Sequence, residues 1–372
     1  MKIIDHGVLN PAQPGTRRAT AAFPSVAALP DGSLMASYRV GTNKDSADAT
    51  VELRRSFDLG RTWSKPVSPF STTLDGKRGS LRCVYLTPLS ESHVLACALW
   101  VDRETYPGLR LFNLETEGCL PMAVVLADSH DLGDTWSPWR VVPVTEDIGP
   151  PSLTSPVLRF ASGKLAVSIE TNKPYYDRST WYQRVVYVFS EDGGRTWSPP
   201  HTTCQDPEAR IFHWDQRAGV GPDGRTVTFT WTYDRHANTY LNIQRRISRD
   251  EGLTWSAPDD LGITDQPSRP AILPDGRVVL AWVDRFQTHS IRARMAPSIA
   301  AGFSGESEVV LYSLEHHRPR HLSNTGDMLA DMNVWTYGLP YAETLPTGEV
   351  MVVYYAGDEN SLDALWYRLC LD

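Results

Sequence analysis

One eight-residue motif occurs four times along the chain, and it constrains the fold more than any other feature. The first copy, Ser-Phe-Asp-Leu-Gly-Arg-Thr-Trp, spans residues 56–63, and later copies begin at Ser129, Ser190 and Ser248. In a tight turn, serine and aspartate side chains accept hydrogen bonds from backbone N–H groups, glycine adopts a positive φ, and threonine and tryptophan then open a strand. The aspartates stand at positions 58, 131, 192 and 250, so 58 to 73 residues separate successive copies. The motif therefore predicts a repeating β unit, and we interpret it as a folding device.

A second and weaker repeat reads Pro-Asp-Gly or a close variant, at 28–32, 221–224, 272–276 and 344–348. Each copy lies between two short apolar or alternating runs, a pattern that predicts a hairpin turn. Six units of four strands fit the chain, beginning near residues 21, 80, 150, 207, 266 and 337. The last unit lacks its outer strand, and we expect residues 2–9 to supply it and so close a ring.

The octapeptides resemble the Asp-box, or bacterial neuraminidase, repeats of the sialidase superfamily, and the resemblance covers nearly all of the chain. It implies an all-β fold, a single six-bladed β-propeller domain over residues 1–372, with the last blade closed by the N-terminal strand. The superfamily also contains other glycosidases, lyases and propellers without activity. Fold alone therefore does not decide the function.

Composition and charge limit the classes of partner and cofactor that we expect. The formal charge of −8 gives no electrostatic reason to expect nucleic acid or an anionic membrane. The sequence has neither a signal peptide nor a long apolar stretch, so we expect a cytoplasmic protein. Five scattered cysteines suggest neither a disulfide framework nor a zinc site, and we interpret His316, His317 and His321 as loop residues. No cofactor motif is present, and we expect no metal and no cofactor.

Sialidases, as the resemblance implies, use a tyrosine nucleophile helped by a carboxylate, an aspartic acid as acid/base and three arginines that hold the substrate carboxylate. Asp45 precedes an apolar strand ending in Arg-Arg, as the family's acid does, and Asp48 is the reserve candidate. Asp215 lies eight residues before Asp223, which is the place of the family's glutamate. Arg217, two residues further on, faces the same side of that strand.

The same eight-residue count in the sixth unit leads to Leu339, which Tyr337 and Tyr341 flank on one strand face. Either tyrosine is a candidate nucleophile. Arg292 and Arg235 lie near the places of two family arginines, while Ala22 occupies the place of the first. Three other arginines are candidate replacements: Arg18, Arg82 and Arg269. A rebuilt arginine set favours a related acidic sugar, such as another nonulosonate or a uronate.

Further residues suggest sugar binding. Tyr176 and Trp181 lie in an aromatic-rich loop of the third unit, and aromatic faces bind the C–H faces of sugars. Glu170, at the end of a strand in the same unit, supports a two-carboxylate glycosidase mechanism as an alternative to the tyrosine one. The sequence thus predicts an exo-acting, retaining hydrolase of an acidic sugar. A carbohydrate-binding propeller without activity, a polysaccharide lyase and another glycosidase on the same fold are the alternatives.

Overall fold

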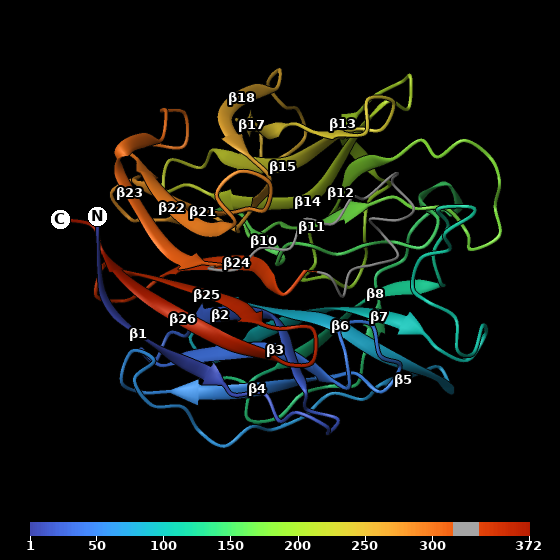
Figure 1. Ribbon diagram of the computed structural model, residues 1–372, viewed down its shortest axis with the longest axis horizontal. Coiled ribbons are helices and arrows are strands. Elements are labelled where there is room, and N and C mark those ends of the chain that lie inside the picture. The colour runs from blue at the N-terminus through green and yellow to red at the C-terminus, as the bar shows by residue number, and fades with distance from the viewer. Residues whose placement is uncertain (315–334) are drawn as a thin grey trace.

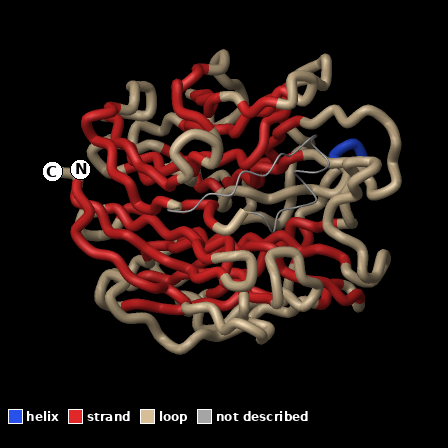
Figure 2. The backbone as a smooth tube through the Cα atoms, in the orientation of Figure 1, coloured by secondary structure: helices blue, strands red, loops and turns tan. Residues whose placement is uncertain are grey.

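The computed structural model describes residues 1–314 and 335–372, and these consist almost entirely of β-strands joined by turns and loops (Figure 2). The helical element among them is one 3₁₀ turn, η1 (Glu146–Ile148). No helix in the described part of the chain has the length and apolar character needed to cross a bilayer. The all-β prediction is confirmed for the described residues, whereas His316, His317 and His321 lie outside them.

Four of the five sheets contain four or five strands that pair antiparallel along the sequence (Figure 1). The first holds β5 (Thr73–Leu74), β6 (Lys77–Pro88), β7 (Val94–Asp102), β8 (Met122–Ser129) and β9 (Arg140–Val141). The second holds β10 (Leu158–Arg159), β11 (Leu165–Glu170), β12 (Arg184–Ser190) and β13 (His201–Gln205). The third holds β14 (Ile211–Val220), β15 (Thr226–Asp234), β16 (Thr239–Tyr240), β17 (Asn242–Ser248) and β18 (Asp259–Thr264). The fourth holds β19 (Gln266–Pro267), β20 (Ala271–Ile272), β21 (Val278–Asp284), β22 (Ser290–Ala296) and β23 (Ser304–Ser313).

The fifth sheet has seven strands and joins the two ends of the chain. Its strands are β24 (Tyr337–Thr344), β25 (Val350–Gly357), β26 (Leu362–Cys370), β1 (Lys2–Asn10), β2 (Thr20–Ala28), β3 (Leu34–Gly41) and β4 (Thr50–Ser56). β1 pairs antiparallel with β26, so the predicted partner strand for the last unit is present and the termini lie side by side (Figure 1). The single parallel pair Thr20↔Leu362 links β26 to β2. At this link the sheet divides into a four-stranded part, β24-β25-β26-β1, and a three-stranded part, β2-β3-β4.

The central strands explain why the sheets pack closely. Every residue of β3, β7, β15 and β21 is buried, whereas β1 is exposed or partly buried as far as Val8 and buried only at its last two residues. Strands that are apolar on both faces need a neighbouring sheet on each side, while an outer strand needs only one. The core consequently lies between the sheets.

The octapeptides form the predicted turns. In the first copy, the Gly60 amide donates to Ser56 Oγ at 2.8 Å, and the Thr62 amide and hydroxyl donate to the Asp58 carboxylate at 2.9 and 2.6 Å. The copies around Asp131, Asp192 and Asp250 repeat these bonds. Leu59 also has a positive φ of 59°, so the turn places two successive residues in the left-handed region. The sequence motif indicated this conformation only for the glycine.

Each octapeptide turn also packs on a strand of the preceding unit. A Cβ added to Gly133 would lie 2.7 Å from Met35 Cε on β3, and one added to Gly60 would lie 2.5 Å from Met351 Cε on β25. The glycines are therefore needed for close packing between units as well as for the turn. The second contact joins the first unit of the chain to the last.

Four strands that begin a unit share an irregularity. β-bulges interrupt the pairing of β2, β6, β14 and β24, at Phe23, Arg82, Asp215 and Leu339 respectively. Phe23, Asp215 and Leu339 have positive φ values of 52°, 46° and 45°. A bulge re-aims a side chain that a regular strand would direct into the sheet packing. All four re-aimed side chains face one cavity.

Candidate functional site

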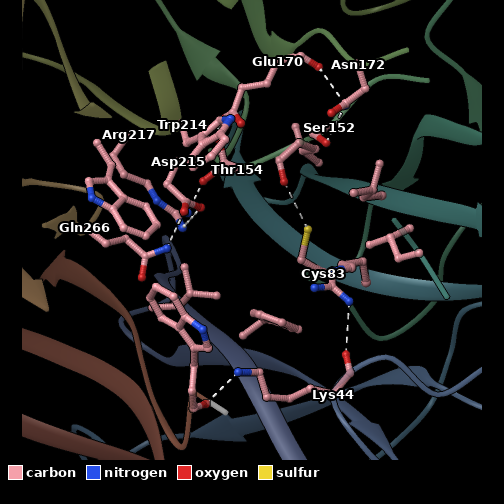
Figure 3. Close-up of a pocket in the computed structure, with 18 of the residues that line it drawn as sticks. Lys44, Cys83, Ser152, Thr154, Glu170, Asn172, Trp214, Asp215, Arg217 and Gln266 are labelled. Atoms are coloured by element: carbon pink, nitrogen blue, oxygen red, sulfur yellow. Dashed lines mark hydrogen bonds and ion pairs between the residues drawn. The ribbon is translucent and has the colours of Figure 1, made fainter. Parts of the chain in front are cut away.

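A cavity of about 170 Å³ lies where these bulges meet (Figure 3). Its wall contains two carboxyl groups, Glu170 and Asp215, which we call the carboxyl pair. Its cationic lining residues are Lys44, Arg82, Arg217 and Arg285, and its tryptophans are Trp181, Trp214, Trp231 and Trp335. Lys44 lies on the opposite side of the cavity from Glu170 (Figure 3). Aromatic walls with a few converging polar groups are typical of sites for small ligands.

Glu170, the last residue of β11, is buried in this wall. Its Oε1 atom accepts hydrogen bonds from the Gln216 amide and from the Thr154 hydroxyl, both at 2.9 Å. Burial, and after it the nearby Asp215 charge, raise the pKa of Glu170 to about 8. Glu170 therefore holds a proton at neutral pH, as a general acid must.

Asp215 lies next to Glu170 but in a different environment. Arg217 Nη2 lies 3.4 Å from its Oδ1 atom, and the Gln266 side-chain amide donates a hydrogen bond to its Oδ2 atom. Gln266 is oriented in turn by Arg285, whose Nη2 donates to Gln266 Oε1 at 2.6 Å, and Arg285 is paired with Asp265 at 3.0 Å. This chain of contacts directs an N–H group at Asp215 and stabilises its negative charge.

Lys44, Arg82 and Arg285 give the opposite part of the cavity its positive charge. Lys44 Nζ donates to the Trp335 carbonyl at 2.6 Å and to the Tyr355 hydroxyl at 3.1 Å. The Arg285 guanidinium lies 3.9 Å from the centre of the Trp335 ring. With Arg217, four cations line the cavity, and three of them lie beside carboxylates: Arg82 beside Asp45, Arg217 beside Asp215 and Arg285 beside Asp265. Four cations against three carboxylates leave a small positive excess, which suits a ligand with an anionic group.

Five residues predicted from the sequence line the cavity: Arg82, Glu170, Trp181, Asp215 and Arg217. Asp45 lies behind the wall instead. Its carboxylate accepts hydrogen bonds from Arg103 Nη2 at 2.8 Å and from the Leu111 amide at 2.9 Å, and Arg82 lies 3.5 Å away. Burial opposes ionisation, but the Arg82 and Arg103 charges outweigh it and lower the pKa of Asp45. Asp45 is thus an anchor for the loop after β7, and these contacts do not favour a proton donor.

The two tyrosines predicted as nucleophiles do not reach the cavity. The Tyr337 hydroxyl donates to the Asp284 carbonyl at 3.4 Å, and Tyr341 is buried between the Tyr85 ring and Arg269. Leu339, which occupies the bulge, faces the cavity in their place. The physical reason is the bulge, because it directs only one side chain of this strand inward. The prediction of a tyrosine nucleophile from this strand therefore has no support in the geometry.

The other predicted residues form contacts away from the cavity. Arg235 pairs with Glu117 at 2.7 Å, Arg269 with Glu343 at 2.8 Å, and Arg292 and Arg18 with Glu308 and Glu52. The Asp48 carboxylate accepts a hydrogen bond from the Thr42 hydroxyl at 2.7 Å, within its own loop. Tyr176 is 61% exposed on a loop near the cavity mouth. These arginines are thus already neutralised by acids and do not form a substrate clamp.

Sequence reasoning missed several lining residues: Phe23, Lys44, Trp214, Trp231, Gln266, Arg285, Trp335, Leu339 and Tyr355. One signal was present for two of them, Phe23 and Leu339. Phe23 lies eight residues before Asp31, just as Asp215 lies eight before Asp223, so the count that found Asp215 also marks Phe23. The position of Arg285 depends on its contacts with Asp265 and Trp335, for which the sequence holds no local signal.

The described part of the chain offers the cavity neither a metal-binding group nor a reactive thiol. Within residues 1–314 and 335–372, no group of three or more histidine, cysteine or acidic side chains is placed to bind a metal ion. Cys83 lines the cavity, but burial raises its pKa to about 11. A thiol in this state is a poor nucleophile at neutral pH. Among the described lining residues, the carboxyl pair is the group suited to acid–base chemistry.

Comparison with known proteins gives likeness in structure only. No family model matches the chain, and no curated protein matches its sequence. A protein of unknown function from Dyadobacter fermentans has a TM-score of 0.76 and 20% identity, covering 100% of this chain and 99% of that one. An α-L-arabinanase from Penicillium chrysogenum, solved with arabinobiose, has a TM-score of 0.67 and 16% identity, and the match covers 100% of this chain and 99% of that one. The intramolecular trans-sialidase from Ruminococcus gnavus has a TM-score of 0.64 and 15% identity, and the match covers 97% of this chain and 96% of that one.

These likenesses extend over the whole length of each chain, but the identities are low. The expected relation to sialidases is confirmed at the level of the fold, and the arabinanase shares that fold. The chain thus has the β-propeller fold of these glycosidases. Because one fold carries several reactions, the function has to be argued from the cavity.

Proposed function

We propose that the protein is a glycoside hydrolase that removes a terminal acidic sugar, with Glu170 as general acid. The observation that carries this proposal is the carboxyl pair: two carboxyl groups in one aromatic cavity, one holding a proton and the other stabilised as an anion. Two carboxyl groups in different protonation states are the usual requirement for glycoside hydrolysis.

The proposed reaction uses each member of the pair once. Glu170 donates its proton to the glycosidic oxygen as the bond to the anomeric carbon breaks. Asp215 supports the other half of the reaction, either by attacking the anomeric carbon or by taking a proton from the attacking water. This assignment replaces the tyrosine mechanism, because Tyr337 and Tyr341 lie outside the cavity lining. The anomeric configuration of the first product, measured by ¹H NMR, distinguishes the two roles of Asp215.

Charge and size support the substrate class. Lys44 lies across the cavity from Glu170 (Figure 3), and a carboxylate on the sugar would be attracted to it and to the lining cations Arg82 and Arg285. The cavity is small, with a volume of about 170 Å³, which favours a single sugar ring inside it. The size therefore supports release of one terminal residue, and the charge supports an acidic one. A neutral arabinose unit is the alternative substrate, since the Penicillium structure was solved with arabinobiose.

A carbohydrate-binding propeller without activity is the second candidate, and a specific observation favours it. Leu339 and Ala22 occupy the places where the resemblance to sialidases implies the nucleophile and the first arginine. A lyase has less support, because it needs a base. Burial raises the pKa of Tyr355, a phenol in the cavity wall, to about 12, so it keeps its proton at neutral pH.

The arrangement of the sheets as six blades in a closed ring belongs to the same proposal. The seven-stranded sheet counts as two blades, β24-β25-β26-β1 and β2-β3-β4, linked by the pair Thr20↔Leu362. The contact of Gly60 with Met351 supports closure, because it repeats between the first and last units the contact of Gly133 with Met35. In a closed ring the first strands of all units face one axis, which is where the cavity lies.

The test is hydrolysis of a panel of 4-methylumbelliferyl glycosides carrying a nonulosonate, a uronate or an arabinofuranose. We expect release of the fluorophore from an acidic member and at least about a hundredfold loss in Glu170→Gln. Binding of the acidic glycosides without any turnover would instead support the non-catalytic candidate. Turnover of the arabinofuranoside alone would overturn the acidic-sugar assignment and retain the hydrolase.

A further inference from the structure

Two long loops form one side of the cavity mouth. The loop 103–121 joins β7 to β8 and contributes Leu111 and Phe112 to the lining. The loop 171–183 joins β11 to β12 and contributes Asn172 and Trp181. Tyr175 belongs to the same apolar cluster as the lining residue Leu111, and Tyr106 and the lining residue Phe112 pack against that cluster.

The two loops are tied together by hydrogen bonds. The Cys119 amide donates to the Lys173 carbonyl at 3.0 Å. The Tyr175 carbonyl accepts bonds from Asn113 Nδ2 at 3.0 Å and from Thr116 Oγ1 at 2.6 Å. Asp45 fixes the first loop by accepting a hydrogen bond from the Leu111 amide. The loops therefore present a single ordered surface and not two independent segments.

On this surface Tyr106, Tyr175 and Tyr176 form a cluster that we call the tyrosine platform. The Tyr106 and Tyr175 rings are stacked with centres 5.7 Å apart. Tyr176 packs edge-on against both, with centres 5.4 and 5.1 Å away. Tyr175 is buried at 7% exposure, whereas Tyr176 is 61% exposed. One ring is thus held in place by two others while most of its own surface is open to solvent.

Polar groups lie beside this exposed ring. Arg178 Nη2 and Glu115 Oε2 form an ion pair at 3.1 Å across the two loops, and both side chains are 75% exposed. Such a pair offers hydrogen-bond donors and acceptors to hydroxyl groups. An aromatic face with adjacent polar groups matches a sugar ring, which has C–H groups on its faces and hydroxyls at its edge.

We propose that the tyrosine platform is a binding site for the second sugar of the substrate, the one released as the leaving group. This inference rests on the proposed hydrolase function of the cavity. Once the terminal sugar fills the small cavity, the next sugar must lie at the mouth, where the joined loops present Tyr176. The pre-organised ring loses little conformational freedom on binding, so the contact adds affinity at small entropic cost.

The test uses full-length protein carrying Glu170→Gln, which stops turnover and leaves the platform unchanged. Its probes are arrayed glycans that end in a nonulosonate, a uronate or an arabinofuranose, each presented as a single sugar and as a disaccharide. We expect disaccharides to bind about fivefold to tenfold more tightly than the matching single sugars. Adding Tyr176→Ala should abolish this difference, and Tyr176→Phe should retain it because the ring is kept. Phe57→Ala, which removes a ring that is 76% exposed in an octapeptide turn, is the matched control.

Different results would overturn the tyrosine platform and the hydrolase proposal. Equal binding of disaccharides by the parent and by Tyr176→Ala would overturn the platform and leave the hydrolase proposal intact. An equal loss for single sugars and disaccharides would also overturn it, because the residue would then act on the cavity and not on a second sugar. Failure of every probe to bind, together with no turnover by the unmodified protein, would overturn the hydrolase function and this inference with it.

Discussion

The octapeptide turns and the cavity both depend on buried or bonded carboxyl groups, yet they are built in opposite ways. In each turn the aspartate bonds to residues two to four positions away, as Asp58 does with Ser56 and Thr62. In the cavity, Glu170 bonds to Thr154 and Gln216, which are 16 and 46 positions away. The turns are local and repeated, whereas the cavity is non-local and occurs once.

The two environments also move the carboxyl pKa in opposite directions. In the exposed turn, hydrogen bonds from Thr135 and Ser129 lower the pKa of Asp131 to about 2. In the cavity, burial raises the pKa of Glu170 to about 8. A carboxylate that stays ionised over the whole working range is suited to structure, while one that titrates near neutral pH is suited to proton transfer. The aspartates of the turns are therefore suited to stabilising the fold, and Glu170 in the cavity is suited to proton transfer.

The largest expected effect comes from the carboxyl pair. Glu170→Gln or Asp215→Asn should lower kcat by about 10²–10⁴, because each removes a proton donor or an anion needed at the reacting bond. Asp58→Asn in an octapeptide turn is the matched control and should leave kcat within about twofold of the parent. Measured kcat values on the responsive 4-methylumbelliferyl glycoside decide this. Similar losses in all three variants would break the division between turns and cavity.

The second effect concerns pH. Because only protonated Glu170 donates a proton, kcat should fall about tenfold per pH unit above about 8. The raised folded-state pKa also means that folding binds a proton here, so its contribution to stability is complete below about pH 4.5 and is lost as pH rises towards 8. Denaturant unfolding of Glu170→Gln between these pH values should lack that contribution. Identical pH dependence of unfolding in the parent and the variant would contradict the raised pKa.

A smaller effect is expected at Gln266, which acts through Asp215. Gln266→Leu removes the amide that donates to Asp215 and that Arg285 orients. We expect kcat to fall by about tenfold, with KM nearly unchanged, because the Asp215 carboxylate loses a hydrogen bond that it needs in the reaction. Gln266→Glu, which keeps the shape but replaces the donor with a second anion beside Asp215, should lower kcat further. An unchanged kcat in both variants, or an equal change in kcat and KM, would limit Gln266 to a packing role.

Local chemistry also explains how far the sequence predicts the molecule. The octapeptides predict turns, the alternation of runs predicts strands, and the incomplete last unit predicts its pairing with residues 2–9, all from neighbours in sequence or from repetition. Asp215 was found because its distance from Asp223 is fixed within one hairpin. Arg285 and Trp335 were not, because their positions follow from contacts between separate units. The count led to Leu339 and its neighbour Tyr341, but the sequence did not indicate the bulge that turns Leu339 and not Tyr341 toward the cavity.

Asp45 lies just behind the cavity wall but is bonded as a structural carboxylate. Asp45→Asn should leave kcat within about threefold and raise KM by about fivefold to tenfold, because the loop that carries Leu111 loses its anchor. It should also lower the free energy of unfolding by ~3 kcal/mol, because Arg82 and Arg103 would keep buried charges with one carboxylate fewer. A loss of kcat as large as that of Glu170→Gln would restore Asp45 as the acid.

The smallest effect on activity is expected from changes in the octapeptide turns. Ser56 Oγ accepts the Gly60 amide and donates to Asp58, both at 2.8 Å, and the side chain is buried. Ser56→Ala should lower the free energy of unfolding by ~1–3 kcal/mol, since it leaves a buried amide without its acceptor, while kcat and KM stay unchanged. Ser190→Ala removes the same bonds in the third copy and should have a similar cost. Because the bonds are local and equivalent, unequal costs in the two copies, or a change in KM in either, would show that the turns are coupled to the cavity through the strands between them.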